Sequence, residues 1–369
     1  MGDLLMKVTR TAVAGVVAAA ALITIGTSTA SAEDQPASEN TSTDQPLRVL
    51  AGKAGIAFGT AVNMDAYNND TTYRELIGQE FSSVTAENVM KWQLLEPQRG
   101  VYNWGPADQL VRVANENGQK VRGHTLIWHN QLPTWLTNGV ASGEITPDEL
   151  RQLLKNHIFT VMHHFKGKIH QWDVANEVID DSGNLRNTIW LQNLGPSYIA
   201  DAFRWARKAD PDAALYLNDY NVEGPNAKAD AYYALVKQLL ADDVPVHGFG
   251  IQGHLGVQFG FWPASAVADN MRRFEALGLQ TAVTEADVRM IMPPDEDKLA
   301  AQARGYSTLV QGCLMAKRCR SFTVWGFTDK YSWVPGTFTG QGAANLLAEN
   351  FQPKPAYHAV QDDLARAGR

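Results

Sequence analysis

The sequence predicts an α/β fold: a single domain built as a closed (β/α)8 TIM barrel. From residue 58 onward, short apolar runs rich in β-prone residues alternate with amphipathic stretches of helical period, and the alternation occurs eight times. Such alternation is typical of a parallel sheet with crossover helices, and eight units close that sheet into a barrel. A doubly wound open sheet is the alternative, but no glycine-rich dinucleotide-binding turn follows the first strand.

The predicted elements follow one another in strict order. The strands are expected at 58–63, 83–87, 120–127, 171–176, 214–218, 248–252, 281–284 and 321–325. The helices are expected at 107–117, 146–165, 196–209, 227–240, 263–277 and 295–316, with a closing helix at 354–366. Residues at helix ends support these bounds: Thr146 before Pro147 is an N-cap signal, and Asn117-Gly118 is a helix stop.

The N-terminal segment is predicted to lie outside the barrel. A basic start, an apolar run at 11–26 and the sequence Ala30-Ser31-Ala32 form the pattern of a secretory signal peptide. A membrane anchor is the alternative, but the apolar run is too short to span a bilayer comfortably. We expect a secreted, extracellular protein without membrane association in its mature form. The predicted organisation is signal peptide 1–32, disordered leader 33–46 and barrel domain 47–369.

Charge and cysteine content narrow the expected partners. The formal net charge is −7 and no basic patch is visible, so we expect no nucleic-acid partner. The only two cysteines, Cys313 and Cys319, lie close together, which in an exported chain predicts a disulfide between a helix and a strand. Two buried free thiols are the alternative. No oligomer signal is present, and we expect a monomer.

Two carboxylates follow predicted strands that lie far apart in the chain. Strand 171–176 leads into Glu177, and strand 281–284 leads into Glu285. Because the C-terminal ends of barrel strands share one mouth, these side chains are expected to face each other. A lone glutamate there would more simply be a salt-bridged rim residue. Two glutamates amid Trp and Asn are the minimum apparatus for breaking a glycosidic bond.

The neighbours of the two glutamates predict different roles. A retaining glycosidase needs one carboxyl that holds a proton and one that stays ionised. Glu285 has a candidate partner in His254, and Asp287, on the same strand face as Glu285, is placed to hold that imidazole. Glu177 has no obvious partner, and Trp172 with nearby aromatic residues is expected to desolvate it. We therefore assign Glu177 as acid/base and Glu285 as nucleophile.

Other side chains are candidates for sugar contacts. Strict strand alternation points Asn176 away from Glu177, so Asn176 reaches the cleft only if the strand bulges or ends there. If it does, its amide can hydrogen-bond the sugar 2-hydroxyl. Trp128, Trp325 and Trp333 are candidate platforms for the apolar face of a pyranose.

A metal site is weakly indicated despite the nine histidines. His124 and His129 are five residues apart, which places them on opposite strand faces unless a turn intervenes, and the helical His157 and His164 lack an H-E-x-x-H pattern. We expect no metal and no cofactor.

The motifs at the strand ends resemble those of the glycoside hydrolase family 10 xylanases, secreted endo-β-1,4-xylanases with a (β/α)8 barrel. The resemblance covers the chain from about residue 50 to its end, through Glu87-Asn88, Met90-Lys91-Trp92, Gly123-His124-Thr125-Leu126, Trp128-His129, Trp172-Asp173-Val174, Asn176-Glu177, Asn218-Asp219-Tyr220-Asn221, Gln252, His254, Thr284-Glu285 and Asp287.

The family resemblance implies specific roles. It implies Glu177 as acid/base and Glu285 as nucleophile. It implies sugar contacts on the non-reducing side of the cut from Glu87, Asn88, Lys91, His124, Trp128, Gln131, Asn176, Gln252, His254, Trp325 and Trp333, with Tyr220 and Asp287 in support. It also implies a Cys313–Cys319 disulfide and a cis peptide at His124–Thr125.

The chain departs from the family pattern at four positions. Val89 and Gln93 stand where acidic residues are common, Asn130 where Ser is usual and Ala286 where Leu is usual. Gln93 is expected to alter the charge near Lys91. Ala286 is expected to face the helix layer, where a smaller side chain affects packing rather than chemistry.

The predicted function is endo-acting hydrolysis of β-1,4-xylosidic bonds in xylan and xylo-oligosaccharides, with retention of configuration through a covalent glycosyl–Glu285 intermediate. One alternative is the same barrel retuned to β-1,4-glucan or plant saponin glycosides. Two others are a non-catalytic carbohydrate-binding barrel and a metal-dependent hydrolase.

Overall fold

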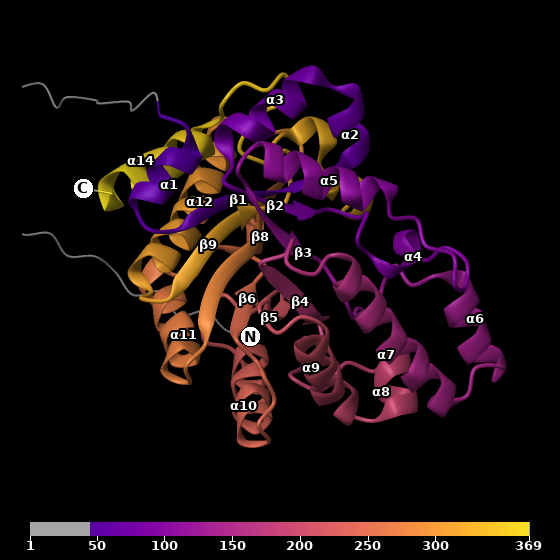
Figure 1. Ribbon diagram of the computed structural model, residues 1–369. Coiled ribbons are helices and arrows are strands. Elements are labelled where there is room, and N and C mark those ends of the chain that lie inside the picture. The colour runs from indigo at the N-terminus through magenta and orange to yellow at the C-terminus, as the bar shows by residue number, and fades with distance from the viewer. Residues whose placement is uncertain (1–44, 369) are drawn as a thin grey trace, which may run out of the picture. The chain divides into compact units, whose positions relative to one another are not determined.

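The computed structural model describes residues 45–368, which form a barrel of parallel strands surrounded by helices (Figure 1). The barrel strands are β1 Ala57–Val62, β2 Ser83–Ala86, β3 Lys120–Gly123, β4 Gln171–Asn176, β5 Ala214–Asp219, β6 Gly248–Ile251, β8 Gln280–Ile291 and β9 Cys319–Val324. Each pairs in parallel with its neighbours in chain order, and β1 pairs with β9, so the sheet closes. The predicted (β/α)8 barrel is confirmed. The predicted signal peptide and residues 33–44 of the predicted leader lie outside the described residues.

Helices cover the outside of the barrel. They are α1 Leu47–Lys53, α2 Met64–Asn69, α3 Thr71–Glu80, α4 Trp92–Leu95, α5 Gly105–Glu116, α6 Thr134–Ser142, α7 Pro147–His164, α8 Ile189–Leu194, α9 Ser197–Ala209, α10 Ala227–Ala241, α11 Ala264–Ala276, α12 Glu296–Met315, α13 Val334–Thr337 and α14 Pro355–Ala367. The first and last, α1 and α14, lie side by side (Figure 1). Within residues 45–368, no helix is both long and apolar enough to cross a membrane.

The start of α7 agrees with the capping signal in the sequence. The Thr146 hydroxyl accepts the backbone N–H of Glu149 at 3.3 Å, so α7 begins with the predicted cap.

A disulfide joins Cys313 at the end of α12 to Cys319 at the start of β9, with an S–S length of 2.01 Å. The predicted disulfide is confirmed, and the alternative of two free thiols is wrong.

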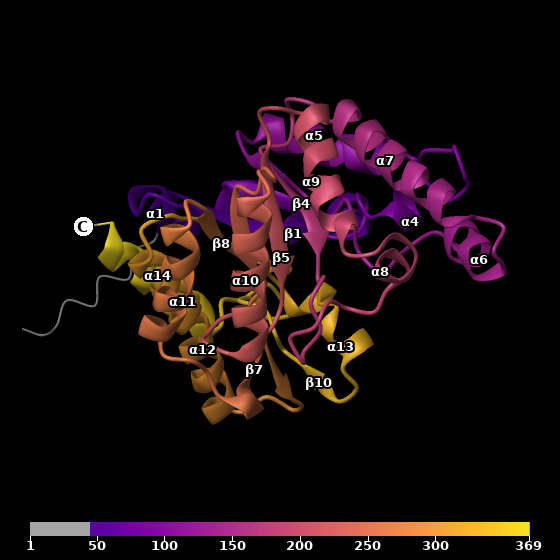
Figure 2. The same cartoon turned by 90° about the horizontal axis from the view of Figure 1, so that it is seen from below.

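Two strand bounds were predicted wrongly. The strand expected at 120–127 stops at Gly123, and beyond it only an isolated bridge between Ile127 and Ala175 pairs this segment with β4. The strand expected at 281–284 instead runs to Ile291, because two short strands pair with its extension: β7 His254–Gly256 and β10 Gln341–Gly342. The short strands β7 and β10 and helix α13 gather at one edge of the molecule in Figure 2.

A bulge in β4 changes which side chains reach the barrel interior. Asp173 pairs with Tyr216, but Ala175 pairs with the very next residue of β5, so Val174 is an extra residue in the ladder. Asn176 therefore lies on the inner side, in contact with Asn218 (2.8 Å). The bulge that Asn176 needs in order to reach the cleft is present.

Trp172 does not lie where the sequence analysis expected it. It is fully buried between the sheet and the helices, where a Cβ on the in-register Gly123 would come within 2.2 Å of its ring. Only a residue without a side chain fits under this indole. The expectation that Trp172 desolvates Glu177 is wrong, since Trp172 fills the layer outside the barrel.

Candidate active site

A cleft of about 700 Å³ opens at the C-terminal ends of the barrel strands. Nearly all the predicted site residues line it: Glu87, Asn88, Lys91, His124, Trp128, Gln131, Asn176, Glu177, Tyr220, Gln252, His254, Glu285, Trp325 and Trp333. Asp287 lies directly behind, 3.0 Å from His254, and accepts a hydrogen bond from Trp333 Nε1 (2.7 Å). The structure thus brings together side chains that lie on β4, β7 and β8 or in the segments directly after β2, β3, β4, β5, β6 and β9.

Glu285 is buried among hydrogen-bond donors and cations. Asn218 Nδ2 donates to its Oε1 at 2.7 Å, and His254 Nε2 lies 3.1 Å from its Oε2. Burial alone would raise the pKa of this carboxyl, but the charges of His124, His254 and Arg122 hold it well below its usual range. Glu285 is therefore ionised at neutral pH, as a nucleophile must be.

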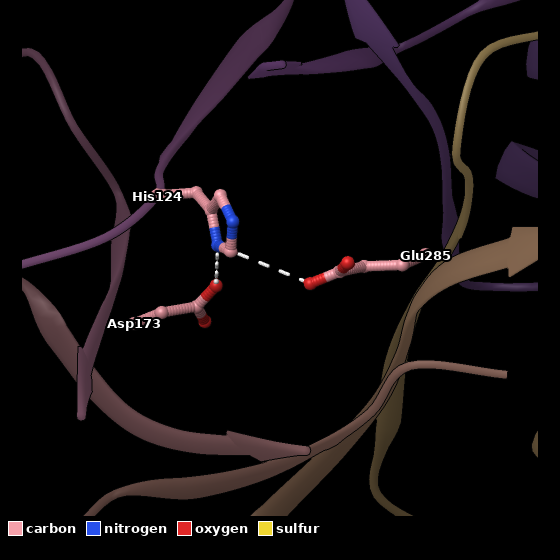
Figure 3. A group of neighbouring side chains, drawn as sticks. All are labelled: His124, Asp173 and Glu285. Carbon is pink, nitrogen blue, oxygen red and sulfur yellow. Dashed lines mark hydrogen bonds and ion pairs between the residues drawn. The ribbon is translucent and has the colours of Figure 1, made fainter. Parts of the chain in front are cut away.

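His124 lies between two carboxylates (Figure 3). Its Nδ1 is 2.9 Å from Asp173 Oδ2 and 3.9 Å from Glu285 Oε1. These three side chains are close enough to hold a metal ion. However, the Arg122 guanidinium forms an ion pair with Asp173 and lies 3.6 Å from Glu285 Oε1. Since Arg122 already supplies positive charge to both carboxylates, the cluster is better described as a buried ion-pair network.

His254 couples Glu285 to Asp287. Burial lowers the pKa of this imidazole, but the carboxylates of Asp287 and Glu285 outweigh burial and raise the pKa to about 10. The expected arrangement, in which Asp287 orients the imidazole toward Glu285, is confirmed by the distances.

The Asp287→Asn variant is expected to lower the pKa of His254, because Asp287 is the largest of the charges that raise it. The pKa of about 10 lies above the ordinary value of 6.5, so the imidazolium contributes its full stability below about pH 6.5. That contribution is lost as the pH rises through about 10, and in the variant the loss comes at lower pH. NMR titration of the His254 ring measures the shift, and urea unfolding against pH measures its effect on stability.

The matched control is Asp269→Asn, at an exposed carboxylate on α11. An unchanged titration of His254 in Asp287→Asn would contradict the assigned coupling.

Glu177 has a different environment. Trp128 Nε1 donates to its Oε2 (2.8 Å), Gln252 Nε2 donates to its Oε1 (3.1 Å), and His129 Nε2 lies 4.0 Å from Oε2. The expectation that Glu177 lacks partners is wrong, because the loop after β3 folds back over the end of β4. Its side chain is 12% exposed, against 5% for Glu285, and its hydrogen-bond donors are neutral. The two glutamates thus differ in charge environment and in access to solvent.

Near Trp128, the cleft presents polar groups around one lysine. Lys91 Nζ donates to Asn88 Oδ1 (3.0 Å) and Gln131 Oε1 (2.6 Å), and it lies 4.9 Å from the centre of the Trp128 ring. Burial lowers the pKa of Lys91 below its ordinary value, and the negative charges of Glu285, Glu87 and Glu177 offset part of this effect. A group of donors and acceptors with an adjacent indole suits the hydroxyls and the apolar face of a sugar.

Several cleft residues received no role from the sequence. Arg186, Arg289, Thr337 and Phe338 on the cleft wall and Arg122 below it were not named, whereas Asn221 and His129 were named only within motifs. Arg186 comes from the loop after β4, where no pattern marks it, and its Nε donates to the Glu177 carbonyl (2.8 Å). Arg122 and Asp173 could have been found, because each lies on the inward face of its strand.

The four departures from the family pattern leave the central contacts intact. Gln93 and Asn130 are exposed and Val89 is half-buried. Ala286 is completely buried in the hydrophobic core, which agrees with the expectation that it faces the helix layer.

Comparison with known proteins places the chain in a family. The model of glycosyl hydrolase family 10 matches residues 46–363. An endo-1,4-beta-xylanase of Agaricus bisporus is 41% identical, covering 86% of this chain and 93% of that protein. Endo-1,4-beta-xylanase B of Thermotoga neapolitana is 42% identical, covering 87% and 92%. Among solved structures, xylanase 10B of Thermotoga petrophila in complex with xylobiose has a TM-score of 0.84 and 43% identity, covering 88% of this chain and 98% of that chain. The chain is a member of glycosyl hydrolase family 10.

Proposed function

We propose that this protein is an endo-acting β-1,4-xylanase that cleaves xylan and xylo-oligosaccharides with retention of anomeric configuration and without a cofactor. The observation that carries the proposal is the contrast between two carboxylates in one cleft. Glu285 is fixed by cations and held ionised, whereas Glu177 is more exposed and has neutral donors. The names of the relatives, endo-1,4-beta-xylanases, support xylan as the substrate.

The proposed reaction has two displacements. In the first, Glu177 donates its proton to the glycosidic oxygen while a Glu285 carboxylate oxygen attacks the anomeric carbon, so the leaving sugar departs as an alcohol. In the second, the Glu177 carboxylate removes a proton from water, whose oxygen replaces Glu285 at that carbon. Glu177 regains its proton for the next turnover, and two inversions give net retention.

Neighbouring groups serve these steps. His254, Asn218 and Arg122 fix the Glu285 carboxylate, and Asn176 is placed beside it to bind the sugar 2-hydroxyl. Such a contact strengthens as charge develops in the transition state. Trp325 and Trp333 supply the aromatic walls of the cleft.

One experiment tests the function directly. Purified protein is incubated with xylan, cello-oligosaccharides and a plant saponin, and proton NMR follows the anomers as they form. We expect β-anomeric products from xylan before mutarotation, with internal cuts that release oligosaccharides. Release of α-anomers, or cleavage only of the glucosyl substrates, would overturn the proposal. A protein that binds xylan without releasing reducing ends would be a carbohydrate-binding barrel.

Selectivity for xylose over glucose is proposed to come from the bulk of Trp333. Its ring centre lies 5.1 Å from that of His254, and its indole N–H is held by Asp287. The Trp333→Ala variant opens space for a hydroxymethyl group, so we expect the xylan-to-glucan ratio of kcat/KM to fall by about tenfold, within the range for one pocket contact. Each variant serves as its own control because two substrates are compared, and an unchanged ratio would contradict the assignment.

Secretion and a monomeric state are also proposed, on the signal-type N-terminus and the absence of an oligomer signal in the sequence. N-terminal sequencing of exported protein tests cleavage after Ala32, and sedimentation analysis tests the monomer.

A further inference from the structure

A second cavity of about 400 Å³ adjoins the catalytic cleft. The two share three lining residues, Asn221, His254 and Arg289. Three of the ten other lining residues are aromatic, and two of these rings reach the surface: Phe259 is 73% exposed and Trp262 is 43% exposed. A volume of this size suits one small polar ligand, and its position makes it continuous with the substrate path.

Arg289 stands at the junction of the two cavities. Its guanidinium carbon lies 4.1 Å from the centre of the Phe338 ring and 5.8 Å from that of Phe259. Nε donates to Gln341 Oε1 (3.1 Å), and Nη1 donates to the Leu255 carbonyl (3.2 Å). The two rings and the two hydrogen bonds hold the guanidinium in a defined orientation.

The charge of Arg289 has no carboxylate partner within 4.0 Å among residues 45–368. Its Nη2 donates to no acceptor in the same part of the chain. The nearest relevant carboxylate, Asp287, is engaged by His254 and Trp333. Two deeply buried lysines are paired with carboxylates, Lys228 with Asp219 (2.9 Å) and Lys354 with Asp329 (2.8 Å), whereas the buried Lys91 in the cleft has neutral hydrogen-bond partners. The half-buried guanidinium therefore keeps a positive charge and an N–H donor that an acceptor on a bound ligand can use.

We infer that Arg289, with Phe338 and Phe259 beside it, binds the carboxylate of a uronic acid branch on the xylan backbone. A planar guanidinium recognises a carboxylate through parallel N–H donors, and aromatic rings pack against the apolar face of a pyranose. The inference rests on the proposed function and extends it to acidic, branched substrate.

One acidic group lines the second cavity. Glu223 is buried and accepts the Gly253 N–H at 3.2 Å, and burial raises the pKa of its carboxyl. Glu223 is thus the group in the cavity lining that opposes an incoming carboxylate, and its hydrogen bond with Gly253 holds it in the wall.

A purely structural role for Arg289 is the alternative, since its hydrogen bonds to Leu255 and Gln341 tie β7 to β10. A structural anchor would affect all substrates alike, whereas a carboxylate site affects only acidic ones. The two roles are therefore distinguished by the ratio of kcat/KM for an acidic substrate to kcat/KM for a neutral one, both measured on the same variant.

The test uses a matched substrate pair: a xylo-oligosaccharide with one glucuronic acid branch, and the same molecule with the carboxyl reduced to an alcohol. Wild-type protein is expected to have a kcat/KM for the acidic member about tenfold above that for the reduced one at low salt. Arg289→Gln is expected to bring the ratio close to one, and Arg289→Lys to retain part of it. Arg112→Gln, at an exposed arginine on α5, controls for net charge.

The outcomes separate the two proposals. No hydrolysis of either substrate would remove the proposed function itself. Hydrolysis of both with a ratio near one in wild type, or a ratio that Arg289→Gln leaves unchanged, would overturn the uronate site while xylanase activity stands. Should the variants fail to fold, the salt dependence in wild type decides: a preference for the acidic substrate that high salt does not reduce would also count against the site.

Discussion

Replacing Glu285 with alanine is expected to lower kcat on xylan by about 10⁵-fold, a loss comparable to removal of other covalent nucleophiles. The physical reason is that the nearby carboxylate of Asp173 cannot replace it as the nucleophile, since Asp173 is tied to Arg122 and His124. Binding of xylo-oligosaccharides should survive, because the aromatic walls and the Lys91 group remain. Single-turnover kinetics and calorimetry measure the two properties separately.

Reaction with azide distinguishes the nucleophile from the acid/base, because the two variants give glycosyl azides of opposite anomeric configuration. Azide can enter the space left in Glu285→Ala and attack the anomeric carbon once, which gives an α-glycosyl azide. In Glu177→Ala it attacks the glycosyl–Glu285 intermediate and gives a β-glycosyl azide. Glu116→Ala, at an exposed glutamate on α5, is the matched control. Near-normal turnover in Glu285→Ala, or the reverse pattern of azide products, would refute the assigned roles.

The Arg122→Met variant is expected to destabilise the folded protein by about 3–5 kcal/mol, because two buried carboxylates lose their shared cation. Arg122 forms an ion pair with Asp173 and lies 3.6 Å from Glu285, and its side chain is 3% exposed. Methionine fills much of the same volume but leaves both negative charges in the barrel interior. Denaturant unfolding at neutral pH measures the loss in free energy of unfolding.

The same variant should shift the pH dependence. In the wild-type protein the pKa of Glu285 is depressed, so its stabilisation is present above the ordinary value of 4.5 and is lost as the pH falls through the lower folded pKa. Without Arg122 the pKa of Glu285 rises, so the acidic limb of kcat/KM should move to higher pH. Arg320→Met, at an exposed arginine on β9, makes the same chemical change as a control. A variant as stable as this control, with an unshifted acidic limb, would refute the network.

Much of the site could be predicted because barrel geometry is regular. Glu177 directly follows β4 and Glu285 follows the apolar first part of β8, and a closed parallel sheet has only one C-terminal rim on which such residues can meet. The pairing of His254 with Asp287 followed from strand alternation alone. These inferences depend on periodicity, which the sequence displays directly.

The features that were predicted wrongly, or not at all, depend on contacts between distant segments of the chain. The bulge at Val174 and the extension of β8 to Ile291 are set by pairing with other strands, which no local pattern reports. Trp128, rather than Trp172, contacts Glu177, because the chain after β3 leaves the sheet and folds over the neighbouring strand. Arg186 lies in a loop without periodicity, so neither its position nor its bonds could be predicted.

The unusual length of β8 has a consequence for how substrate preference can change. Glu285, Asp287 and Arg289 stand at alternate positions of one continuous strand, so Glu285 and Arg289 are separated by roughly 13 Å along a stiff backbone. The strand therefore fixes the spacing between the two side chains. Laboratory evolution toward differently decorated polysaccharides should therefore collect substitutions at its odd-numbered positions beyond Asp287. An inserted or deleted residue in this strand would instead turn every later side chain to the opposite face.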